Sequence, residues 1–157
     1  MWDIQGSVTL AAGIEPAAVR ARIESDLRIM AHTTVWPGEN KITFRVSGER
    51  WWRGGMPWDN LDAGQVRIDP AGRSISFQLD MTRMFYRCLL VIPFFFLFGL
   101  FTGQSPIWAA AFGIFAFVFG WAGNHWWAEQ RVTRYLTQVA KGAPYKQPLG
   151  PSFWAKP

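Results

Sequence analysis

The sequence predicts an α+β domain, followed by a two-helix transmembrane hairpin and an extended C-terminal tail. Between Arg87 and Glu129 the chain contains no Asp, Glu, Lys or Arg. A bilayer crossing needs about 20 mostly apolar residues, so this interval is long enough for two crossings and a short turn. Before Arg87, stretches of alternating apolar and polar residues surround one stretch with helical periodicity, which indicates strands and a helix.

Residues 1–82 form the predicted cytoplasmic domain, with the order β-α-β-β-β. Residues 2–10 alternate loosely and predict the first strand. Apolar residues then recur every three or four positions and predict one amphipathic helix over Pro16–Met30. Alternation indicates three more strands: Lys41–Ser47, Gln65–Asp69 and Ser74–Met81. Thr33–Trp36 is a weaker candidate for a further strand and stays open. We expect an antiparallel sheet covered by the one helix.

Residues 83–125 are the predicted hairpin. The first crossing runs from about Met84 to Phe101, and Pro93 should kink it because proline lacks the N–H that a helix interior requires. Small, polar and helix-breaking residues over 102–106 predict the turn. The second crossing is expected to begin near Pro106, which suits a first helical turn.

Residues 126–141 are predicted to continue the second crossing as a cytoplasmic amphipathic extension. Ala128, Val132, Tyr135 and Val139 form its apolar stripe. Gly142 is the predicted end of the helix, because glycine readily adopts the left-handed conformation found there. The remaining tail, 142–157, is rich in proline and lacks periodicity, so we expect no core of its own.

The distribution of charge predicts the location. Residues 1–87 hold 11 Lys and Arg against 10 Asp and Glu, whereas residues 125–157 hold five against one. A basic excess beside the membrane predicts a cytoplasmic flank, so both termini should be cytoplasmic in a two-pass protein of a bacterial-type inner (cytoplasmic) membrane. The N-terminus lacks the features of a signal peptide. The positive charges form no dense patch, so we expect no nucleic-acid partner.

The second crossing carries a seam of small residues, spaced as in a heptad: Ala109, Gly113, Ala116, Gly120 and Gly123. Small residues let membrane helices approach closely. Gly99 and Gly103, on the side of the first crossing, are the expected partners of this seam. An aromatic ridge is offset from this seam by one residue: Trp108, Phe112, Phe115 and Phe119. The ridge either has plain lipid contact, with Trp108, Trp126 and Trp127 as interface anchors, or docks against another membrane protein or a bound pigment, quinone or lipid.

Two further groups of aromatic residues are candidate contact sites. Trp51, Trp52 and Trp58 lie in a Gly-rich loop. They either fill the core of the small domain, or rest on the membrane surface, or anchor a protein interface. Tyr145, Phe153 and Trp154 are the residues of the tail through which a partner would order it.

His125 is the one candidate cofactor ligand, since a neutral imidazole can bind the metal of a haem or chlorophyll. A histidine at a membrane interface is more often simply hydrogen-bonded to water or backbone. The sequence contains no zinc, phosphate-loop, nucleotide or hydrolase motif. We therefore expect no catalytic residues, no metal site and no enzymatic activity. No cofactor is required, and contact with pigment, quinone or lipid stays open.

These features together favour a non-catalytic accessory subunit of a larger integral-membrane complex, such as a photosynthetic or respiratory assembly. Its expected partners are other integral-membrane subunits and membrane lipids. Two alternatives from other classes remain. One is a free-standing, membrane-tethered binding module that presents the tryptophan loop. The other is a small cofactor-binding membrane protein that uses His125.

Overall fold

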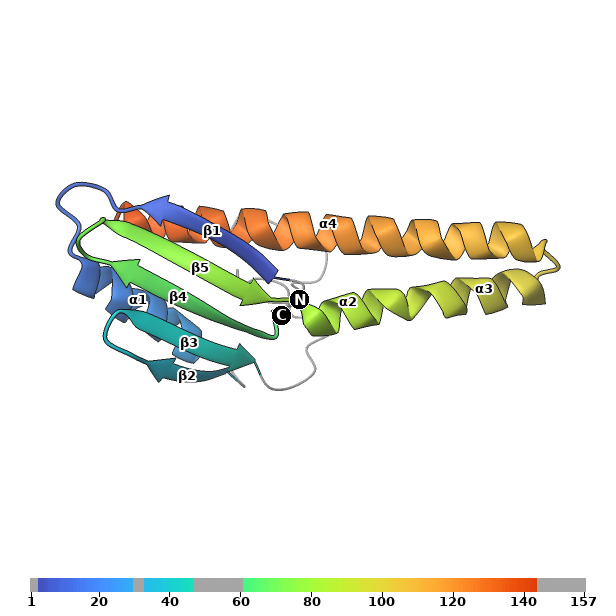
Figure 1. Cartoon of the computed structure of the whole chain (residues 1–157), viewed down its shortest axis with the longest axis horizontal. Coiled ribbons are helices and arrows are strands. Elements are labelled where there is room, and N and C mark those ends of the chain that lie inside the picture. The colour runs from blue at the N-terminus through green and yellow to red at the C-terminus, as the bar shows by residue number, and fades with distance from the viewer. Residues whose placement is uncertain (1–2, 30–32, 47–60, 144–157) are drawn as a thin grey trace, which may run out of the picture.

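The computed structural model of the chain describes residues 3–29, 33–46 and 61–143. The molecule is elongated, with a β-sheet at one end and a helical hairpin at the other (Figure 1). One helix, α4 (Pro106–Ala140), runs along the whole length and belongs to both parts. The tryptophan loop and the aromatic residues of the tail lie outside the described residues.

The sheet has five antiparallel strands in the order β1-β5-β4-β3-β2. The bounds of the strands are Asp3–Thr9 for β1, Thr33–Pro37 for β2, Lys41–Val46 for β3, Ala63–Asp69 for β4 and Ser74–Asp80 for β5. The predicted antiparallel α+β domain is thus confirmed, and the strand left open in the sequence is β2. The domain therefore contains one strand more than the order β-α-β-β-β.

Alternation places one face of each strand in the core. Ile42, Val66 and Phe77 lie side by side on β3, β4 and β5, and all three are buried. Phe77 is paired across β5 and β1 with Gly6. A Cβ atom at Gly6 would lie 2.5 Å from the Phe77 ring, so only glycine leaves room for this ring.

Two helices cover this apolar face, whereas the sequence predicts only one. The first is α1 (Pro16–Ile29), which buries Val19, Ile23 and Leu27 at helical spacing. The second is the C-terminal half of α4, which contributes Ala128, Val132, Tyr135, Leu136, Val139 and Ala140 to the same core. The stripe predicted for residues 126–141 is therefore buried, but against the sheet. Its segment belongs to the domain and is not a separate extension.

Polar contacts fix the position of α4 over the sheet. The Tyr135 hydroxyl donates a hydrogen bond to the Asp26 carboxylate on α1 at 2.6 Å. The Ala11 N–H, just after β1, donates to the Ala140 carbonyl at 3.1 Å. Gly142, with φ of 69°, ends the helix as the sequence predicts. Its N–H bonds to the Val139 carbonyl, in the pattern of a Schellman motif.

The other arm of the hairpin consists of α2 (Thr82–Leu89) and α3 (Val91–Phe101). The interruption at Leu90 lies where Pro93, without an N–H and with a bulky ring, disturbs the preceding turn. Leu90 keeps helical angles, and its N–H still bonds to the Tyr86 carbonyl, so the helical conformation continues from α2 into α3. Gly103, with φ of 75°, lies in the turn that leads to α4.

Shortening the Leu136 side chain should unfold the sheet domain more easily. Leu136 is fully buried in the core, so Leu136→Ala is expected to lower the free energy of unfolding by about 2–5 kcal/mol. The measurement is denaturant unfolding of the purified protein in detergent, followed by the strand signal in circular dichroism. Arg134→Ala, an exposed position on the same helix, is the control and should change stability by less than about 0.5 kcal/mol. Equal effects of the two substitutions would contradict the packing of α4 on the sheet.

Candidate membrane-facing surface and its junction with the sheet

The hairpin presents a large apolar surface to its surroundings. Both arms, Thr82–Phe101 and Pro106–Ala140, are long and apolar enough to span a membrane. Only 11% of the most apolar window of each arm is buried, whereas the core helix of a soluble protein is mostly buried. Exposed apolar patches of this extent mark surfaces that contact a membrane or another protein.

Small residues bring the two arms together near the turn. A Cβ atom at Gly99 would lie 2.5 Å from the Cβ of Ala109, and one at Gly113 would lie 2.9 Å from the Ile92 carbonyl oxygen. Gly99, Ala109 and Gly113 are all buried. These contacts show that part of the predicted seam does join the two arms, through backbones that approach closely.

The rest of the predicted seam does not join the arms. Gly103 lies in the turn, and a Cβ atom there would meet nothing within 4 Å. Gly120 and Gly123 are equally open on their side of α4. Ala116, between them and Gly113, is half-buried. The reason is that aromatic rings separate the arms near the sheet, where Phe85 of α2 contacts Phe117 and Trp121 of α4 with ring centroids 5.6 and 5.2 Å apart.

The aromatic ridge lies on the outside of the hairpin, with side chains that are 55–72% exposed: Trp108, Phe112, Phe115 and Phe119. Phe112 also contacts Phe95 of α3, edge to face, with centroids 5.0 Å apart. Phe115 and Phe119 lie against each other at 4.3 Å. Trp126 and Trp127 are exposed farther along α4, at the end of the apolar segment.

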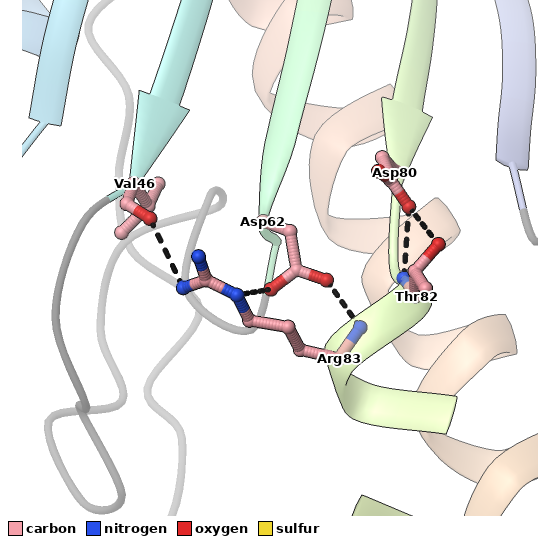
Figure 2. A network of polar contacts seen from close by, with 5 residues as sticks. All are labelled: Val46, Asp62, Asp80, Thr82 and Arg83. Atoms are coloured by element: carbon pink, nitrogen blue, oxygen red, sulfur yellow. Dashed lines mark hydrogen bonds and ion pairs between the residues drawn. The ribbon is translucent and has the colours of Figure 1, made fainter. Parts of the chain in front are cut away.

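A polar network joins the sheet directly to α2 (Figure 2). The Asp80 carboxylate, at the end of β5, accepts hydrogen bonds from the Thr82 N–H and hydroxyl. The Asp62 carboxylate accepts the Arg83 N–H and forms an ion pair with the Arg83 guanidinium at 3.7 Å. The N–H groups of the first helical turn have no acceptors within the helix, and the two carboxylates accept hydrogen bonds from two of them.

Burial raises the pKa of the Asp62 carboxyl above its ordinary value of 3.8, while the Arg83 contacts act in the opposite direction. The side chain of Asp62 is only 15% exposed, whereas that of Arg83 is 53% exposed. The effect of desolvation on the Asp62 carboxylate is therefore larger than its stabilisation by Arg83, which is largely solvated.

Figure 1 looks onto the sheet face opposite the helices, which no other described element covers. Most of its side chains are polar, and Trp36 on β2 is exposed there. Its centre is a shallow hollow over β1, β5 and β4, lined mainly by Gln5, Ser7, Gln65, Arg67, Ser76 and Gln78. Gln65 donates to Gln78 at 2.5 Å, and Gln78 donates to the Asp3 carboxylate at 2.9 Å. This face offers hydrogen-bonding groups and no apolar anchor in the hollow.

His125 is half-buried on α4, and its ring lies 5.6 Å from that of Trp121, centroid to centroid. Within the described ranges, no group of three or more His, Cys, Asp or Glu side chains lies close enough together to hold a metal ion. Trp51, Trp52, Trp58, Tyr145, Phe153 and Trp154 fall outside those ranges, so their assigned contacts stay predictions.

One notable residue is missed by reasoning from the sequence. Arg131 of α4 is only 7% exposed and its guanidinium carbon lies 4.1 Å from the centroid of the Trp127 ring. Its spacing from Trp127 is visible in the sequence. Its burial is not, because that depends on how α4 packs against the domain.

The two ends of the small-residue seam should respond differently to an added methyl group. Gly99→Ala and Gly113→Ala must push the arms apart, so each is expected to cost about 1–3 kcal/mol. Gly120→Ala meets open space and gains helix propensity, so stability should be unchanged or raised by up to about 1 kcal/mol. Thermal unfolding of the three variants in one detergent makes the comparison. A loss at Gly120 as large as that at Gly113 would contradict this hairpin geometry.

The raised pKa of Asp62 predicts a pH dependence of stability. The folded protein holds this proton more tightly than the unfolded chain does, so the contribution is fully present below pH 3.8 and is lost as pH rises through the raised pKa. Asp62→Asn cannot titrate but keeps an oxygen for the Arg83 N–H. The stability of the wild type relative to this variant should therefore fall as pH increases. Unfolding of both proteins, measured between about pH 3 and pH 7, tests this prediction. If the wild type instead becomes more stable than Asp62→Asn as pH rises, the ion pair with Arg83 dominates over burial.

The chain was also compared with known proteins. It matches no protein-family model, and no curated protein or solved structure is similar to it. The surfaces described above are therefore the basis for a functional conclusion.

Proposed function

We propose that this chain is a two-pass membrane protein that serves as a non-catalytic accessory subunit of a larger integral-membrane complex. The observation that carries the proposal is that α4 is a single helix of 35 residues, apolar and exposed in its first half and buried against the sheet in its second. Such a helix holds a soluble domain in a fixed orientation relative to a membrane hairpin.

The dimensions of α4 fit this arrangement. At 1.5 Å per residue the helix is about 52 Å long, while the hydrocarbon core of a bilayer is about 30 Å thick. The first 20 residues or so are enough to cross, and the remainder extends into the sheet domain. The exposed Trp126 and Trp127 then lie at the membrane surface, where tryptophan is enriched.

Positive charge near the sheet supports a cytoplasmic domain. Arg83 and Arg87 lie on α2, next to the sheet, and Arg131, Arg134 and Lys141 lie on the half of α4 that packs on the sheet or just after it. The turn over 102–105 carries no charge. Because Lys and Arg are retained on the cytoplasmic side, the sheet and both termini are proposed to be cytoplasmic and the turn to be on the far side of a bacterial-type inner membrane.

The aromatic ridge supports assembly with other subunits. Exposed rings on a hairpin whose arms already pack on each other are free to contact neighbouring membrane helices or a flat pigment or quinone. Photosynthetic and respiratory complexes contain such neighbours, and they are the hosts we favour. Lipid contact explains the same rings without a partner, so isolation of the assembly is the deciding experiment.

A second candidate function is a free-standing, membrane-tethered binding module. The polar hollow around Gln65 and Gln78 favours it, because it is open to the cytoplasm in the proposed orientation. In this case the domain would recruit a soluble ligand without any membrane partner.

The two functions are separated by gentle detergent extraction of the chromosomally tagged protein, followed by native mass spectrometry. The accessory-subunit function predicts a complex much heavier than the 17.9 kDa chain, with defined stoichiometry. A monomer or simple homo-oligomer under conditions that preserve known membrane complexes would contradict it. The ridge variant Phe115→Ala should weaken assembly, and Ile107→Ala, an exposed residue near the turn, is its control.

The proposed orientation predicts an accessibility pattern. With Cys88 replaced by alanine, Ser105→Cys in the turn should react with a membrane-impermeant thiol reagent added from the periplasmic side. Ser76→Cys on the open sheet face should react only after the membrane is opened. Labelling of Ser105→Cys from the cytoplasmic side alone would overturn the orientation.

A further inference from the structure

Arg131 is the one charged residue that is buried among residues 3–29, 33–46 and 61–143, with 7% of its surface exposed. Its Nε atom has neither solvent access nor a hydrogen-bond partner. None of the ion pairs formed within those ranges involves it. The Trp127 ring under the guanidinium supplies a cation–π contact but no hydrogen-bond acceptor.

A buried guanidinium whose Nε atom has no acceptor favours a nearby anion. Taking a charge out of water costs several kcal/mol unless it is paired and hydrogen-bonded. The cation–π contact with Trp127 offsets part of this cost but offers no acceptor to the N–H donors. Arginine also has a planar fork of donors, which matches the oxygens of a phosphate or carboxylate.

The position of the guanidinium identifies which anion is near. The Phe85–Trp121 contact places Trp121 beside the part of α2 that lies between Arg83 and Arg87, just before the charge-free segment. Trp127 lies about 9 Å farther along the α4 axis, and the Arg131 side chain points back onto it, because helical side chains lean toward the N-terminus. In the proposed bilayer the exposed Trp126 and Trp127 lie at the membrane surface, so the guanidinium over Trp127 is at the level of the lipid headgroups.

The face of α4 below Arg131 has room for a lipid chain. Gly120, Gly123, Trp127 and Arg131 are spaced three or four residues apart, so they share one face of the helix. Gly120 and Gly123 are the open positions of the small-residue seam, where a Cβ atom meets nothing within 4 Å. The two glycines thus leave an open strip on this face in the hydrocarbon core, and Trp127 lies between the strip and Arg131.

We propose that this strip and Arg131 form a binding site for an anionic phospholipid. The phosphate accepts hydrogen bonds from the guanidinium, and an acyl chain lies against Gly120 and Gly123. The basic flank of the hairpin favours an anionic headgroup over a zwitterionic one. The site rests on the membrane placement of the hairpin given under the proposed function.

The test uses the full chain, purified in a mild detergent and delipidated. Thermal unfolding and native mass spectrometry are measured with phosphatidylglycerol, with phosphatidylcholine and with inorganic phosphate. Phosphatidylglycerol should stabilise the wild type and remain bound in the mass spectrum. Arg131→Gln should weaken this binding at least about tenfold, since a buried charge-assisted contact is lost. Arg134→Gln, an exposed arginine on the same helix, is the matched control and should bind as the wild type does.

Gly123→Leu is a second variant that leaves the arginine and the core intact. It fills the strip in open space, so it should reduce binding of phosphatidylglycerol while folding is retained. If inorganic phosphate stabilises the protein as much as the lipid does, the ligand of Arg131 is a free phosphate. If a co-purified protein is released by Arg131→Gln, the ligand is a carboxylate of a partner protein. Either result overturns the lipid site, as does equal binding to Arg131→Gln and Arg134→Gln. In each case membrane fractionation of the wild type shows separately whether the hairpin is in the membrane.

Discussion

The burial of the C-terminal half of α4 against the sheet is the interaction on which the rest of the structure depends. Val132, Tyr135 and Leu136 fill the part of the apolar face that α1 leaves uncovered. The hydrogen bond from Tyr135 to Asp26 then ties the two covering helices together. Because α4 is continuous from the turn to this core, any movement of the hairpin relative to the sheet has to bend a helix or open the core. The sheet domain and the hairpin are therefore joined by a continuous helix, and not by a flexible tether.

The second connection between the two parts is equally short. β5 ends at Asp80 and α2 begins at Thr82, with only the buried Met81 between them. Asp62 and Asp80 satisfy the first donors of α2, so the junction is fixed by hydrogen bonds as well as by chain connectivity. This geometry determines where the arms lie: aromatic rings hold them apart at the sheet, and Gly99 and Gly113 let them meet near the turn. The open glycines of α4, Gly120 and Gly123, are a consequence of this divergence.

Much of this fold can be predicted from the sequence because it depends on local patterns. Alternation identifies the strands, three- and four-residue spacing identifies α1, and the loss of charge after Arg87 identifies the two apolar arms. Gly142 and Pro106 correctly mark the ends of α4. What the sequence does not contain is the partner of each apolar stripe. The stripe through Val132 could have been covered by any apolar surface, and Gly120 and Gly123 have the same spacing as Gly113 although only Gly113 packs on the other arm. Both outcomes depend on how the arms cross, which is a property of the assembled structure.

The most direct test of the account is a distance measurement between the turn and the sheet in a lipid nanodisc. Spin labels would be placed at Gln104→Cys in the turn and at Ser76→Cys on the open face of β5, in a background with Cys88 replaced by alanine. If α4 is one rigid helix shared by the hairpin and the domain, double electron–electron resonance should give a single narrow distance distribution. Inserting two glycines between Asn124 and His125 should broaden it. A distribution that is already broad without the insertion would contradict the shared helix and, with it, the fixed orientation on which the proposed function depends.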